Sequence, residues 1–126
     1  MTELFLNTPQ QYNQTHTRQQ VFESLAKYAD QRNQDSNDKI RQAQAMMALD
    51  VSDRFDGSMQ RAAAAVKAKV LVIIASKDHM VTPGPARDFA ALLHASILEL
   101  DSDCGHLAPV CEGAKLSSAV ADFLRN

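Results

Sequence analysis

The sequence predicts an α/β fold, and three features of its 126 residues support this prediction. Residues 1–67 are rich in glutamine and place apolar side chains at helical spacing. Residues 68–126 alternate strand-like and helix-like stretches. Within them, the uninterrupted apolar run Val70–Ala75 is typical of a strand buried on both faces of a sheet. We therefore predict a helical, lid-like segment over 1–67, followed by two parallel strands and two helices over 68–126.

Composition and charge exclude several functional classes. The chain is long enough for one small domain with a modest core. Its net charge of -2 provides neither a basic surface for nucleic acid nor a polybasic membrane anchor. The longest apolar run is far shorter than the roughly 20 residues that span a bilayer, and the amino terminus has no signal-peptide pattern. We expect no nucleic-acid or membrane partner, and a cytoplasmic protein.

The first segment is predicted to contain three helices after a terminus that is loose or ordered only by a partner. Residues 1–15 have no sustained period, and Pro9 interrupts them. A helix is expected from Arg18 to about Asp30, and a second from a cap at Asn37 or Asp38. Ser58 is expected to cap a third helix that extends to about Val66.

Apolar stripes on these helices predict that they cover other parts of the molecule. The first stripe contains Val21, Phe22, Leu25, Ala26 and Ala29, and the second contains Ile40, Ala43, Met46, Met47 and Leu49. We expect Met46, Met47 and Met59 to fill gaps in a core, with a flexible lid or a dimer surface as the alternative.

The second segment predicts a crossover between two strands. A loop rich in proline follows Val70–Ala75, and a helix follows from about Pro85 to His94. The second strand is Ser96–Leu100, and a final helix begins at about Glu112. A strand, helix and strand of one sheet connect almost always as a right-handed parallel crossover. The loops after both strands therefore leave the same edge of the sheet, where active sites of α/β proteins gather.

Asp78 and His106 are the candidate catalytic residues. Asp78 follows the first strand, and His106 follows the second within a Gly-His loop. In a triad of nucleophile, histidine and acid, the carboxylate fixes the imidazole tautomer so that the other ring nitrogen can accept the nucleophile's proton. Gly105 suits such a loop because a residue without Cβ permits unusual backbone conformations and close approaches. Asp101 and Asp103 are alternative carboxylates, although they lie on the histidine's own loop.

The remaining histidines and the cysteines are given other roles. His16, His79 and His94 are interpreted as surface residues or as residues whose hydrogen bonds are satisfied locally. Cys104 and Cys111 are expected to be free thiols, with a disulfide between them as the less favoured alternative. A cysteine nucleophile is disfavoured because neither cysteine follows a strand in the manner of a nucleophile elbow. A metal site formed by His79, Cys104 and His106 is disfavoured because the spacing does not suit it. We predict no cofactor and no metal.

At these residues the chain resembles the carboxyl-terminal portion of the α/β-hydrolase superfamily. The matching text, from Ala68 to Asn126, is AKVLVIIASKDHMVTPGPARDFAALLHASILELDSDCGHLAPVCEGAKLSSAVADFLRN. There the family has its last two strands, an acid loop with a nearby proline, a Gly-His loop and a terminal helix. The resemblance implies that Asp78 is the triad acid and His106 the triad base.

Upstream, ALDVSDRFDGSMQRAAAAVKAKVLVI looks like the lid helices of homoserine O-acetyltransferases and their relatives. This resemblance implies acyl transfer from a donor such as acetyl-CoA, through an acyl-serine, in the complete enzyme. That family typically has an aspartate directly after the histidine, for the amine of the acceptor. Here that position is Leu107, so a related acyltransferase or hydrolase remains an alternative.

The sequence lacks the nucleophile that this chemistry requires. It contains no G-x-S-x-G elbow, and Gly57-Ser58 follows no buried strand. Two strands also leave sheet edges that would be exposed in an isolated monomer. We therefore expect a carboxyl-terminal fragment that is inactive alone and forms a homodimer or joins the missing amino-terminal part. A non-catalytic, self-associating interaction module is the alternative.

Overall fold

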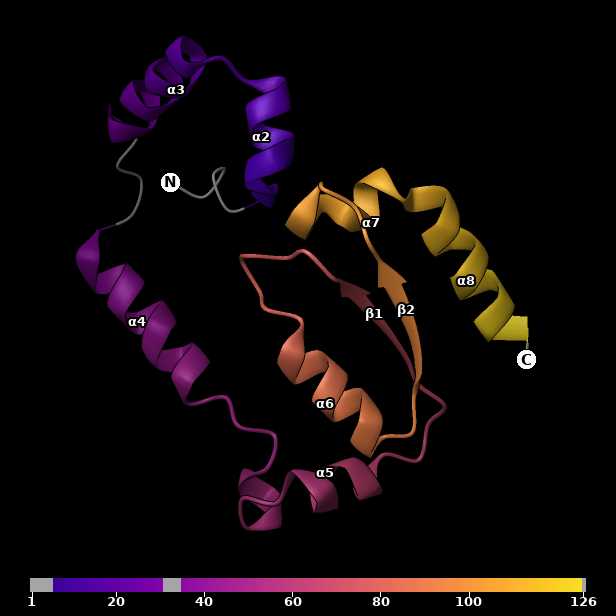
Figure 1. Ribbon diagram of the computed structural model, residues 1–126. Coiled ribbons are helices and arrows are strands. Elements are labelled where there is room, and N and C mark those ends of the chain that lie inside the picture. Colours follow the sequence, from indigo (N-terminus) through magenta and orange to yellow (C-terminus); the bar gives the residue numbers. More distant parts are fainter. Residues whose placement is uncertain (1–5, 31–34, 126) are drawn as a thin grey trace.

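The computed structural model describes residues 6–30 and 35–125, except the side chains of 28–30, and mixes helices with a small sheet (Figure 1). This confirms the α/β class. In chain order the elements are α2 (Pro9–Thr15), α3 (Arg18–Asp30), α4 (Ser36–Met47), the 3-10 turn η1 (Asp53–Phe55), α5 (Met59–Ala65), β1 (Leu71–Ala75), α6 (Gly84–Leu92), β2 (Ser96–Leu100), the 3-10 turn η2 (Gly105–Leu107), α7 (Ala108–Cys111) and α8 (Gly113–Arg125).

The two strands pair in parallel, as predicted. The register runs from Leu71 opposite Ser96 to Ala75 opposite Leu100. Helix α6 connects the strands and packs on both. An ion pair of 2.8 Å between Arg87 Nε on α6 and Glu99 Oε1 on β2 also joins this helix to the sheet. The loops that follow β1 and β2 consequently leave the same sheet edge.

The core lies between the strands and the helices next to them. Its fully or almost fully buried members are Ile74, Ala90, Leu100 and Ala108, together with Ala62 and Ala63 of α5. Ser58 caps α5 as predicted, and α5 packs against α6. The expectation that β1 is buried on both faces is wrong, because Ile73 is 39% exposed. The side of β1 that carries Ile73 is therefore not fully covered.

The amino-terminal segment is more regular than its sequence suggested. In place of the expected loose terminus to residue 15, the structure has helix α2. The Thr8 hydroxyl accepts a hydrogen bond of 3.2 Å from the Gln11 N–H and so caps this helix. Pro9 occupies its first position, where a missing N–H costs nothing. Residues 1–5, included in the same expectation, lie outside the described residues.

Helices α3 and α4 form as predicted, but their apolar faces are not covered. Figure 1 shows both helices standing away from the sheet, and every residue from 35 to 51 is exposed. Met46 and Met47 are 77% and 85% exposed, so the expectation that they fill core gaps is wrong, whereas Met59 is partly buried. Asp35 caps α4, instead of Asn37 or Asp38. A helical stripe establishes amphipathicity and does not show that a covering surface is present.

Across residues 6–30 and 35–125, no helix combines the length and the apolar character needed to cross a membrane.

Candidate active site

Asp78 and His106 are in direct contact. A turn directly after β1 brings in Asp78, whose N–H donates to the carbonyl of Ala75 at 3.2 Å. The turn η2, after β2, carries His106. His106 Nδ1 lies 2.8 Å from Asp78 Oδ2, although 28 residues separate the two in the chain. The juxtaposition predicted from the crossover is confirmed.

The Asp78 carboxylate is held at both oxygens. Its Oδ1 accepts hydrogen bonds from the N–H groups of Met80, at 2.8 Å, and Val81, at 2.9 Å. The side chain is only 10% exposed. Burial raises the pKa of Asp78, but the hydrogen bonds from Val81, His106 and Met80 together outweigh it and hold this pKa below its ordinary value of 3.8. Asp78 is therefore ionised at neutral pH.

The ionised carboxylate determines the tautomer of His106. A carboxylate only accepts hydrogen bonds, so the ring nitrogen that faces it, Nδ1, carries the proton. In neutral His106 the other nitrogen, Nε2, then has its lone pair free to accept a proton. Among the described residues, Asp78 is the only hydrogen-bond partner of the ring, which is 36% exposed. This is the arrangement that a general base requires.

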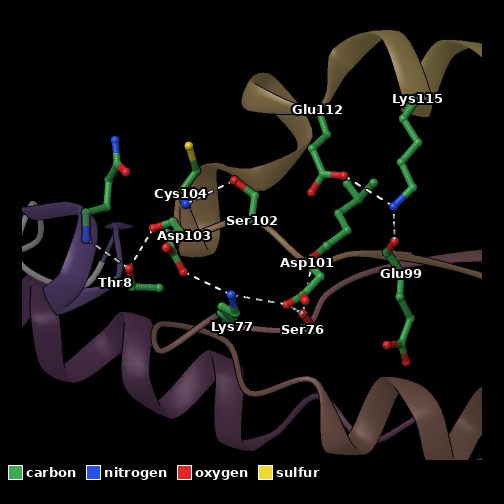
Figure 2. Close-up of polar contacts among 12 residues, drawn as sticks. Thr8, Ser76, Lys77, Glu99, Asp101, Ser102, Asp103, Cys104, Glu112 and Lys115 are labelled. Atoms are coloured by element: carbon green, nitrogen blue, oxygen red, sulfur yellow. Dashed lines mark hydrogen bonds and ion pairs between the residues drawn. The ribbon is translucent and has the colours of Figure 1, made fainter.

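The other two candidate carboxylates are occupied elsewhere (Figure 2). Asp103 Oδ1 lies 2.9 Å from Lys77 Nζ. Asp101 Oδ1 accepts a hydrogen bond of 2.8 Å from the Ser76 hydroxyl and lies 3.4 Å from Lys77 Nζ. The Ser76 hydrogen bond, followed by the charge of Lys77, lowers the pKa of Asp101. The geometry therefore favours Asp78 as the acid partner of His106.

Thr8 is a residue of this region that the sequence did not reveal. Its N–H and its hydroxyl both donate to the carbonyl of Asp103, at 3.0 and 2.8 Å, across 95 residues (Figure 2). Thr8 is 2% exposed. The Thr-Pro pair that begins α2 was a usable signal of the helix cap, but nothing in the pattern predicts the long-range contact.

Gly105 adopts a conformation and a position that favour glycine. Its φ of +57° lies in the left-handed region. A Cβ at this residue would lie 3.1 Å from the carbonyl oxygen of Leu6 and 3.2 Å from the nitrogen of Thr8. The predicted role of Gly105, which is to permit an unusual backbone and a close approach, is confirmed.

A cavity of about 490 Å³ lies between the loops that follow the two strands and the start of α2. It is lined by Thr8, Gln10, Ser76, Lys77, His79 and Asp103. The charge of Lys77 is compensated there by Asp101 and Asp103. The cavity is thus a polar recess without an excess of positive charge. His79, predicted to be a surface residue, is exposed at its rim.

The expectation of free thiols is wrong, because Cys104 and Cys111 form a disulfide. Cys104 immediately precedes η2 and Cys111 ends α7, and this turn brings their Cα atoms to 6.5 Å, within the range that a disulfide bridges. The spacing of the two cysteines in the sequence does not reveal this turn. Bridged sulfurs serve neither as a nucleophile nor as thiolate ligands. Within the described ranges, no cluster of three or more His, Cys, Asp or Glu side chains is placed to hold a metal ion.

No family model, curated protein or solved structure matches the chain. The functional assignment accordingly rests on the residues of the site and on their geometry.

Proposed function

We propose that this chain supplies the acid and the base of an α/β-hydrolase-type active site. The observation that carries the proposal is the 2.8 Å contact between Asp78 Oδ2 and His106 Nδ1, at the edge of a parallel sheet where the strands end. The two residues follow consecutive strands in the order acid, then histidine, which α/β-hydrolases use. Their surroundings favour an ionised acid and a base with Nε2 free.

The roles of the two residues follow from this geometry. His106 Nε2 takes the proton from a nucleophile as the nucleophile attacks an acyl carbonyl. The imidazolium then returns the proton to the leaving group. Asp78 remains ionised throughout, orienting the ring through Nδ1 and stabilising its transient positive charge.

The nucleophile and the donors for the oxyanion come from a polypeptide segment outside this sequence. The sequence has no G-x-S-x-G elbow. Ser58, which follows Gly57, accepts a hydrogen bond of 3.2 Å from the Arg61 N–H and caps α5. We infer that this chain is the carboxyl-terminal part of an acyltransferase similar to homoserine O-acetyltransferases, or of a hydrolase. Acetyl-CoA is a suitable acyl donor for the complete enzyme. Because Leu107 replaces the aspartate that homoserine O-acetyltransferases use for the amine of the acceptor, the proposal does not assign homoserine as the acceptor.

The test uses this chain joined to the segment that precedes it and carries the elbow, with an activated acetyl ester as substrate. We expect Asp78→Asn and His106→Ala each to lower kcat/KM by at least about 10³-fold, because loss of a triad member has effects of this size. Asp88→Asn and His94→Asn are matched controls on exposed residues of α6 and the turn after it. Activity like that of the wild type in both site variants would exclude the roles assigned to Asp78 and His106.

A second candidate function, a self-associating interaction module, is favoured by one specific observation. Met46, Met47 and Leu49 are 77, 85 and 81% exposed, and the neighbouring Val51 is 57% exposed. A run of large apolar side chains left in water marks an interaction surface. Under this alternative the chain forms a homodimer, and Asp78→Asn and His106→Ala leave the assembly unchanged. Sedimentation of the wild type and of both variants tests this alternative, and a stable, well-folded monomer would contradict it.

A further inference from the structure

The loop that carries His106 is anchored from outside by the amino-terminal segment. Within the loop, short-range bonds form the turns, such as the N–H of Gly105 donating to the Ser102 carbonyl at 3.2 Å. These bonds shape the loop but do not fix it to the rest of the molecule. Thr8 supplies two bonds that do, both to the Asp103 carbonyl, three residues before His106.

The packing around Gly105 makes this anchor tight. The backbone of residues 6–8 lies so close to Gly105 that even a Cβ would be 3.1 to 3.2 Å from it. Thr8 is 2% exposed, so its hydroxyl and N–H exchange few hydrogen bonds with water. Figure 2 shows Thr8 at the backbone carbonyl of Asp103 and Lys77 at its carboxylate.

We propose that Thr8 is a positioning residue for His106: through the Asp103 carbonyl and the close approach to Gly105, it holds the imidazole in line with Asp78. This inference rests on the proposed function, in which His106 is the general base. It adds that the amino-terminal segment forms part of the active-site scaffold, although it lies 95 residues away in sequence from the loop that it fixes.

Three substitutions separate this role from the capping of α2. Thr8→Ser retains a hydroxyl that both accepts from the Gln11 N–H and donates to Asp103. Thr8→Asp retains a capping acceptor but has no hydroxyl hydrogen to donate. Thr8→Val has neither. Thr15→Val is the matched control, because among the described residues the Thr15 hydroxyl bonds only to groups of α2 and its end, including the Gln11 carbonyl at 2.9 Å.

The readout is the tautomer of His106, measured from the ring ¹⁵N chemical shifts of histidine-labelled protein at a pH where the ring is neutral. His106→Ala assigns the signal. We expect Nδ1–H to predominate in the wild type, in Thr8→Ser and in Thr15→Val. Thr8→Val and Thr8→Asp are expected to lower the ratio of Nδ1–H to Nε2–H by roughly fivefold, the effect of losing one hydrogen bond.

Three results would overturn the proposal. One is a tautomer ratio within about twofold of the wild type in both Thr8→Val and Thr8→Asp, twofold being well below the effect of one hydrogen bond. Another is a change in Thr8→Val alone, since that result assigns the effect to the helix cap. The third is a wild type in which Nδ1–H does not predominate. The first two results are obtained without substrate and leave the catalytic role untouched, so a failure of the positioning role is distinguished from a failure of the catalytic role, which kcat/KM tests.

Discussion

His106 donates from Nδ1 to Asp78 Oδ2 at 2.8 Å, and the second oxygen of Asp78 is held by two backbone N–H groups. The Asp78 carboxylate is thus fixed by N–H groups of its own loop, independently of its contact with the His106 ring. Strands β1 and β2 bring the two loops together at one sheet edge.

The first prediction concerns acid stability. The folded-state pKa of Asp78 lies below its ordinary value of 3.8, so its ionised form stabilises the fold above that value, and this stability is lost as the pH falls through the folded-state pKa. Asp78→Asn should be less stable than the wild type at neutral pH, with the difference shrinking below pH 3.8. Urea unfolding of both proteins from pH 7 to pH 2 measures this. A stability difference that is independent of pH would contradict the prediction.

The second prediction concerns Gly105. Alanine there meets both a left-handed φ of +57° and backbone atoms within 3.2 Å. Gly57 has a φ of +74° but open space around it, so Gly57→Ala reports the cost of the backbone conformation alone. We expect Gly105→Ala to lower the free energy of unfolding by about 3 kcal/mol and Gly57→Ala by about 1 kcal/mol. Equal losses in denaturant titrations would show that the close approach to residues 6–8 contributes nothing.

The third prediction concerns the disulfide. Cys104 and Cys111 are seven residues apart and enclose His106 in a small covalent ring. A disulfide that closes a loop of this length adds about 2 kcal/mol to the free energy of unfolding. The double variant Cys104→Ser, Cys111→Ser should therefore have a free energy of unfolding lower by that amount. A dithiol reductant should destabilise the wild type equally and leave the double variant unchanged. Thermal unfolding with and without reductant provides the comparison, and a wild type insensitive to reductant would show that the bridge contributes no stability.

The fourth prediction concerns self-association through the apolar surface of α4. Met46→Gln and Met47→Gln should each raise the dimer dissociation constant by about tenfold, because each removes roughly the transfer free energy of one buried methionine. Gln42→Ala, on an exposed residue of the same helix, is the control. Sedimentation equilibrium measures the constants. If the proteins are monomers at every concentration, or if all three variants associate like the wild type, this surface is not the interface.

The sequence was informative where local pattern and topology agree. The uninterrupted apolar run of β1, the alternation after it and the rule for parallel crossovers were sufficient to place Asp78 beside His106. Glycine before the histidine predicted an unusual backbone, and Gly105 has one. These inferences need only residue types and the order of the elements.

Other features depend on contacts that no local pattern encodes. Pro9 interrupts the helical pattern of the sequence, yet in the structure it occupies the first position of α2, where proline is favoured, and Thr8 provides the cap. The disulfide depends on η2 and α7 turning the chain between Cys104 and Cys111. The stripes of α3 and α4 are amphipathic as expected, but their burial requires a partner surface that the described part of the chain does not provide.

The most direct measurement of the central claim is a double-mutant cycle on kcat/KM, made with this chain joined to the segment that carries the nucleophile. If Asp78 acts only by orienting and stabilising His106, the double variant Asp78→Asn, His106→Ala should be no slower than His106→Ala alone, since groups that act as a unit are not additive. If the two losses multiply in the double variant, the residues act independently. That outcome would contradict an acid–base pair.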